Sequence, residues 1–121
     1  APAAPGAKPR STSPAAVGDG ETWLGSVTLP PAAKTGPHTH GHTEVAVYVV
    51  RGRSEIRWGE RLEFRAEIGP GDFAYFTPFV PHQEINLDTE AVLEFVVVRS
   101  DNEAIVVPLD VTPEQSPETV Y

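Results

Sequence analysis

Residues 54–71 read SEIRWGERLEFRAEIGPG, and this stretch decides the fold class. From Arg61 to Ile68, charged and apolar side chains alternate, so that four charged residues share one face and four apolar residues share the other. A period of two is typical of a β-strand with one buried face. The Gly59-Glu60 pair separates this strand from the SEIRW segment, and Gly-Pro-Gly at 69–71 ends it. The stretch therefore predicts two antiparallel strands joined by a turn.

Strand-like patterns continue on both sides of this pair. They occur at residues 23–29, 44–50, 72–77, 82–87, 92–98 and 104–109. No segment of about ten residues carries the apolar stripe of a helix. Short strands at regular spacing, separated by Gly and Pro, predict an all-β fold, either a sandwich or an antiparallel barrel.

The ends of the chain differ in composition from the strand-rich middle. Residues 1–20 are mostly Ala, Pro, Gly and Ser, which predicts a flexible or extended tail. Residues 111–121 are Pro-rich and polar, and we expect a C-terminal arm that either packs or frays. The remaining residues, 21–110, suit one domain with one core.

Charge and composition narrow the partners and the site chemistry. The net charge is −8, which argues against nucleic acid as a partner because phosphate contacts need clustered Lys and Arg. Neither a bilayer-spanning apolar run of about 20 residues nor a secretory signal is evident, so we expect a soluble, cytoplasmic protein. Cysteine is absent, so a metal site must use imidazole, carboxylate or water.

Three of the four histidines lie in one segment, PHTHGHTE at 37–44. On an extended strand, His38 and His40 point the same way, and Glu44 shares their parity unless the chain turns at Gly41. An antiparallel barrel can bring His82 opposite them. Three imidazoles and one carboxylate suit Fe, Mn, Co, Ni, Cu or Zn and leave two coordination positions open. Taken alone, the segment is equally consistent with a solvated loop, and His82 with a buried core histidine.

Two separated blocks carry a resemblance. The first has His38, His40 and Glu44 in His-x-His-x3-Glu spacing, followed by Gly52. The second runs from Gly71 to His82 and Asn86, with Thr77 and Phe79 in place of the usual Pro and Gly. Together they resemble the paired motifs of the cupin superfamily, over residues 22–110. Seven residues instead of six separate Glu44 from Gly52, which suggests a β-bulge, and Ala32 stands where the family has Gly.

The resemblance implies a single-domain antiparallel β-barrel of the cupin type, a jelly roll. It also implies one divalent metal ion per chain, held by His38, His40, Glu44 and His82. His42 could displace a neighbouring ligand, support the site from outside or be a solvated loop residue. Glu84 shares parity with His82, so it is either a carboxylate that orients a ligand imidazole or a surface residue.

Alternation along the strands predicts a largely apolar pocket beside the metal. Tyr48 could donate a proton, clamp a substrate or simply pack in the core, and Glu44 could shuttle a proton. Leu93 should face inward with the pocket residues of its strand. The expected pocket residues are Ala46, Tyr48, Trp58, Phe79, Phe95 and Val97.

The resemblance implies a metal-dependent enzyme, first of all a small-molecule oxygenase. An isomerase, a lyase or a cyclase resembling polyketide cyclases is the non-oxidative alternative, with the metal as Lewis acid. A non-catalytic small-molecule binding or sensor module is the third interpretation, since fold does not determine function. We also expect a homodimer, because exposed sheet edges need cover.

Overall fold

The computed structural model describes residues 8–10, 22–101 and 105–120. Within these ranges the chain forms eleven strands and no helix, which confirms the all-β prediction. The strands are β1 (Lys8–Arg10), β2 (Trp23–Leu29), β3 (His38–Thr39), β4 (Val45–Arg51), β5 (Ser54–Trp58), β6 (Phe64–Ile68), β7 (Phe73–Phe76), β8 (His82–Asn86), β9 (Leu93–Arg99), β10 (Val107–Pro108) and β11 (Glu118–Thr119).

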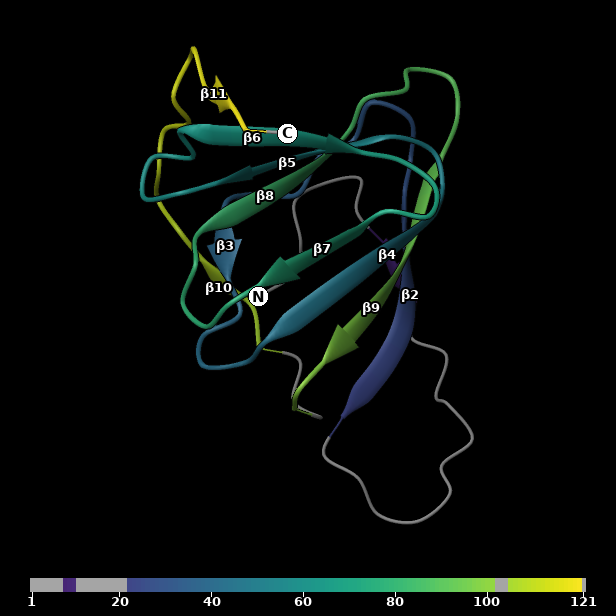
Figure 1. Cartoon of the computed structure of the whole chain (residues 1–121), viewed down its shortest axis with the longest axis horizontal. Coiled ribbons are helices and arrows are strands. Elements are labelled where there is room, and N and C mark those ends of the chain that lie inside the picture. Colours follow the sequence, from purple (N-terminus) through teal and green to yellow (C-terminus); the bar gives the residue numbers. More distant parts are fainter. Residues whose placement is uncertain (1–7, 11–21, 102–104, 121) are drawn as a thin grey trace.

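The strands form two sheets that face each other as a jelly-roll sandwich (Figure 1). The first sheet has the order β1-β2-β9-β4-β7, and the second has the order β10-β3-β8-β5-β6-β11. Neighbouring strands are antiparallel, except that β11 runs parallel to β6. The core lies between the sheets, where apolar side chains of β4 and β9 cluster with Ile56 of β5.

The predicted jelly roll is confirmed, as a sandwich of two sheets that does not close into a barrel. Closure would require β6 to pair with β7, but β6 has β5 on one side and β11 on the other. The segment expected to be a C-terminal arm supplies β11, where the Glu118 amide donates to the Glu63 carbonyl at 2.7 Å. The Val120 amide donates to Arg65 at 2.9 Å. The arm thus occupies the edge that a closing strand would need.

Residues 54–71 fold as predicted, with one change at the turn between the two strands. Ser54 pairs with Ile68 and Trp58 with Phe64, so β5 and β6 form the expected antiparallel pair. However, β6 begins at Phe64 and not at Arg61, because the chain turns at Leu62, where φ is +53°. Leu62 is nevertheless fully buried, as its place in the apolar alternation indicates.

Strand β4 determines which side chains face the core. Val45, Val47 and Val49 are buried, so the residues between them lie on the outer face of the first sheet. The pairing of β4 with β9 shifts register between Val49 and Arg51, which confirms the bulge predicted from the extra residue before Gly52. Because the shift comes after Val49, it leaves the alternation from 45 to 49 undisturbed.

The predicted N-terminal tail, residues 1–20, lies mostly outside the described residues. Its described part, Lys8–Arg10, is extended and pairs antiparallel with β2. In the part of the chain that the structure describes, no helix is long and apolar enough to cross a membrane.

Replacing Gly52 by alanine should destabilise the fold far more than replacing Gly71. Both residues have positive φ, +94° and +90°. A Cβ on Gly52 would lie 2.9 Å from the Val92 carbonyl oxygen and the Leu93 Cα, whereas one on Gly71 would meet nothing within 4 Å. We expect Gly71→Ala to lower the free energy of unfolding by about 1 kcal/mol and Gly52→Ala by at least about 2 kcal/mol, measured by urea denaturation. Equal losses would contradict this account of the bulge.

Candidate metal centre

The histidine-rich segment spans the passage from one sheet to the other. His38 lies on β3 of the second sheet, opposite His82 on β8, while β4 belongs to the first sheet. Between β3 and β4 the chain turns at Gly41, where φ is +59°, and the Thr43 amide donates to the His40 carbonyl at 3.1 Å. His38 and His40 therefore precede the turn and point the same way, as the period of two predicts.

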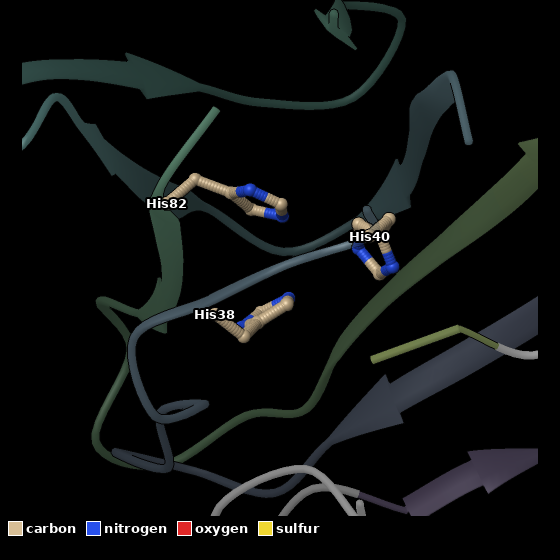
Figure 2. Close-up of side chains that lie close together, drawn as sticks. All are labelled: His38, His40 and His82. Atoms are coloured by element: carbon tan, nitrogen blue, oxygen red, sulfur yellow. The ribbon is translucent and has the colours of Figure 1, made fainter. Parts of the chain in front are cut away.

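The structure brings His38, His40 and His82 together in one cluster (Figure 2). One ring nitrogen from each lies within 4.8 Å of those of the other two. Their ring centroids are 4.3–5.0 Å apart. Two segments more than 40 residues apart thus contribute to a single site, because β3 and β8 are neighbours in the second sheet.

Backbone carbonyls orient all three rings. The Nδ1 atoms of His38, His40 and His82 lie 2.7, 2.8 and 3.0 Å from the carbonyl oxygens of Gly36, Ile105 and Val80. Since a carbonyl can only accept, each Nδ1 carries the hydrogen. In the neutral ring, Nε2 then holds a free lone pair, and this is the usual arrangement of metal-binding histidines.

The surroundings keep two of the rings neutral. Burial lowers the pKa of His82 from 6.5 to about 4, and burial likewise lowers the pKa of His40. The His82 Nε2 is buried and has no hydrogen-bond partner. A buried polar atom without a partner is destabilising, and a metal ion is the partner that an imidazole lone pair suits best. The residues present therefore fit a divalent metal.

Glu44 does not join the cluster. It follows the turn at Gly41 and precedes the buried Val45, so alternation directs its side chain to the outer face, where it is exposed. There its carboxylate accepts a hydrogen bond from the Tyr75 hydroxyl. The structure therefore does not bring Glu44 beside the three histidines, because the chain turns at Gly41 and parity is not transmitted through a turn.

Glu84 is the carboxylate that lies beside the histidines. It is 5% exposed, and its Oε1 lies 3.6 Å from His82 Nε2 and its Oε2 3.9 Å from His38 Nε2. The Thr35 hydroxyl donates to Oε2 at 3.1 Å. The sequence left Glu84 either beside a ligand imidazole in the interior or on the surface, and the structure places it in the interior.

His42 lies outside the cluster. Its side chain is 67% exposed, and its Nε2 is 3.4 Å from the Asp101 carboxylate. This position matches the interpretation of His42 as a solvated loop residue.

A pocket of about 650 Å³ opens where the sandwich is not closed, between β5 and β6 on one side and β7 on the other. Of the six expected pocket residues, only Trp58 lines it. Phe95 and Val97 are packed in the core instead, and Phe79 is 67% exposed on a loop. Ala46 and Tyr48 lie on the outer face of β4, where the Tyr48 ring is 4.9 Å from the Phe73 ring.

Phe76 links the pocket to the histidines, although it is not among the expected pocket residues. Its ring is stacked on His82, with centroids 4.0 Å apart and planes at 16°, and it also lines the pocket. None of the three histidines is among the residues that line this pocket. The alternation of β7, which buries Phe76 and exposes Tyr75, is the signal that could have identified it.

Comparison with known proteins gives a family match and several structural neighbours. The family model described as "Cupin domain" matches residues 25–99, more than half of the chain. No curated protein matches the chain.

Among solved structures, the polyketide cyclase RemF from Streptomyces resistomycificus is 21% identical, with a TM-score of 0.73, over 91% of this chain and 75% of that one. An uncharacterized Klebsiella pneumoniae protein with a double-stranded β-helix domain is 20% identical, with a TM-score of 0.66, over 85% and 90% of the two chains. An oxalate oxidase in complex with glycolate is 15% identical, with a TM-score of 0.66, over 74% of this chain. This chain covers only 46% of that oxidase. At these identities the likeness concerns the fold alone.

Acid should destabilise the metal-free protein between pH 6.5 and about 4, because the pKa of His82 falls from the first value to the second on folding. Because the folded pKa is about 4 and the ordinary value is 6.5, the unfolded chain binds more protons between these values. Stability is then fully present above pH 6.5 and is lost as the pH falls. We expect the free energy of unfolding to drop by roughly 2 kcal/mol from pH 6.5 to 4.5 in chelator-treated protein.

The control for this prediction is the exposed His42. A His82→Gln variant should show a flatter dependence of unfolding free energy on pH over that window, while His42→Gln should keep the wild-type slope. Equal slopes in wild type and His82→Gln would contradict the assigned cause.

Proposed function

The chain belongs to the cupin domain family, and from that premise we propose that it is a metal-dependent enzyme that oxygenates a small organic molecule. The observation that carries the proposal is the buried Nε2 of His82, which has no hydrogen-bond partner and lies in one cluster with His38 and His40. A buried lone pair without a partner is difficult to explain as packing alone. It is accounted for if the cluster binds a divalent ion.

His38, His40 and His82 would hold the metal through their Nε2 atoms. A bound divalent ion would supply Lewis-acid polarisation of a substrate oxygen and a place for dioxygen beside it. The protein contributes neutral imidazoles, because burial lowers the pKa of His40 and His82 and protons therefore do not compete for these lone pairs at neutral pH.

The pocket supports a small and partly aromatic substrate. Its volume of about 650 Å³ is in the range of small-molecule sites. Trp58 and Phe76 line it, and Phe76 also contacts His82. A flat apolar molecule could stack against these rings and extend a polar group towards the histidines.

The structural neighbours include both oxidative and non-oxidative enzymes by name, an oxalate oxidase and a polyketide cyclase. The proposal of oxygenation therefore rests on the three-histidine cluster and on the chemistry its open positions allow. A cyclase-like or isomerase-like reaction and a non-catalytic binding module are the outcomes that the experiments must distinguish from it.

Metal content is the first test. Protein purified without added metal or a chelating tag should contain about one divalent ion per chain. His82→Ala should lose at least about nine-tenths of it, while His42→Ala should retain it. Less than about 0.1 metal per chain in the wild type, with no rise in melting temperature on adding metals, would reject the site.

Turnover is the second test. A panel of small aromatic and carbonyl compounds should be consumed by the Fe-, Mn-, Ni- or Cu-loaded protein with stoichiometric uptake of dioxygen, measured with an oxygen electrode. Activity of the Zn-loaded protein under anaerobic conditions would overturn oxygenation in favour of a Lewis-acid reaction. Tight binding without turnover across the panel would indicate a binding module instead.

We further propose that two copies pair through the outer face of the first sheet. Two cross-strand rows of mostly apolar side chains run across this face, since residues directly opposite each other share a face. One row contains Leu24, Val98, Ala46 and Tyr75, and the other contains Val96, Tyr48 and Phe73. Phe73 is 73% exposed and belongs to the edge strand β7, an apolar edge that a second copy would cover.

Light scattering after size exclusion should therefore give twice the chain mass of 13.0 kDa. Phe73→Lys should give a monomer, because it adds a charge to the proposed interface. Leu87→Lys changes an exposed apolar residue just beyond β8 in the other sheet and should leave the dimer intact. A monomeric wild type would contradict the dimer without affecting the metal site.

A further inference from the structure

A buried carboxylate lies inside the sandwich beside the histidines. Glu84 is on β8, two residues after His82, and it is 5% exposed. Its partners are the Thr35 hydroxyl and the Nε2 atoms of His38 and His82. Among residues 8–10, 22–101 and 105–120, no lysine or arginine forms an ion pair with it. Burying a carboxylate in this way is strongly unfavourable unless a positive charge compensates for it.

The imidazole atoms nearest to Glu84 do not donate to it. The Glu84 oxygens lie 3.6 Å from His82 Nε2 and 3.9 Å from His38 Nε2, beyond the reach of a direct hydrogen bond. The buried His82 Nε2 has no hydrogen-bond partner at all. A cation between the Glu84 carboxylate and His82 Nε2 would offset the buried charge and give the nitrogen a partner.

We infer that Glu84 is the carboxylate ligand of the metal centre, in the role that the sequence motif suggests for Glu44. This inference rests on the proposed metal-dependent function. It restores a donor set of three imidazoles and one carboxylate, but with the carboxylate on β8 instead of at the start of β4.

The side on which Glu84 lies distinguishes a ligand from an orienting group. A carboxylate that orients a metal-bound histidine accepts from the nitrogen that faces away from the metal. In this site those nitrogens, the Nδ1 atoms, are already held by the carbonyls of Gly36, Ile105 and Val80. Glu84 instead lies on the Nε2 side, where the ion would bind.

The alternation of β4 explains why the role would move. The bulge comes only after Val49, so the three buried valines keep their alternation and Glu44, one residue before Val45, faces outward. On β8 the same alternation directs His82 and Glu84 to the interior together. A carboxylate on β8 could therefore take the place of one at the start of β4 while the three histidines keep their positions.

Cobalt(II) titration of two matched variants tests the inference. Glu84→Gln preserves shape and an acceptor for Thr35 but removes the charge, and Glu44→Gln makes the same change on the outer face. We expect Glu84→Gln to weaken Co²⁺ binding at least about tenfold and to change the visible absorption of the bound ion. Glu44→Gln should stay within about twofold of the wild type and keep its spectrum.

Thermal melting provides a second readout. When Co²⁺ is added to chelator-treated protein, Glu84→Gln should gain less in melting temperature than the wild type, because one ligand of the ion is lost. A Glu84→Gln variant with unchanged affinity, spectrum and thermal gain would overturn the inference while leaving the metal site intact.

If Glu84→Gln does not fold, infrared difference spectra of the Glu44→Gln variant test the inference instead. In Glu44→Gln, whose change lies at an exposed position, Co²⁺ should still shift a carboxylate stretching band. Binding without any such shift, or a large loss of affinity in Glu44→Gln, would overturn the role of Glu84. A wild type that binds no Co²⁺ would instead overturn the proposed function, so the two failures are distinguishable.

Discussion

The burial of alternate valines on β4 constrains most of the site. Val45, Val47 and Val49 contribute to the core between the sheets, and moving this strand by one residue would expose all three. Each of these side chains contributes a few kcal/mol by leaving water, so the inward face of β4 is strongly determined. Because the face is determined, Glu44, Ala46 and Tyr48 must lie outside, whatever chemistry their residue types would suit.

The second constraint is the pairing of the C-terminal segment with β6. Strand β11 gives the β6 edge a hydrogen-bonded neighbour, so β7 has only β4 as a partner. The sandwich therefore opens between β6 and β7, and the pocket lies in this opening. A closed barrel would have filled the same space with side chains. The position of the pocket thus depends on residues near the end of the chain, far from the histidines in sequence.

Features that lie within one strand could be predicted from the sequence. The alternation at 54–68 predicted β5 and β6, and His38 and His40 were expected on one side because they are two positions apart. The extra residue before Gly52 indicated the bulge. The direction of Glu44 could not be predicted in the same way, because it depends on whether the chain turns at Gly41. The pocket could not be located either, because the pairing of β11 with β6 is a long-range contact that leaves no periodic signal.

Burial of the imidazoles and burial of Glu84 act together on the choice between a proton and a metal ion. Desolvation disfavours a charged His82, which is why its pKa falls to about 4, and the carbonyl of Val80 directs its lone pair to the same side as Glu84. A proton on His82 would neutralise one unit of charge and leave the other imidazoles without a partner. A divalent ion shared by several donors compensates for the carboxylate and satisfies the lone pairs at once. The stacking of Phe76 on His82 restricts rotation of the ring, so this geometry does not have to be assembled when the ion binds.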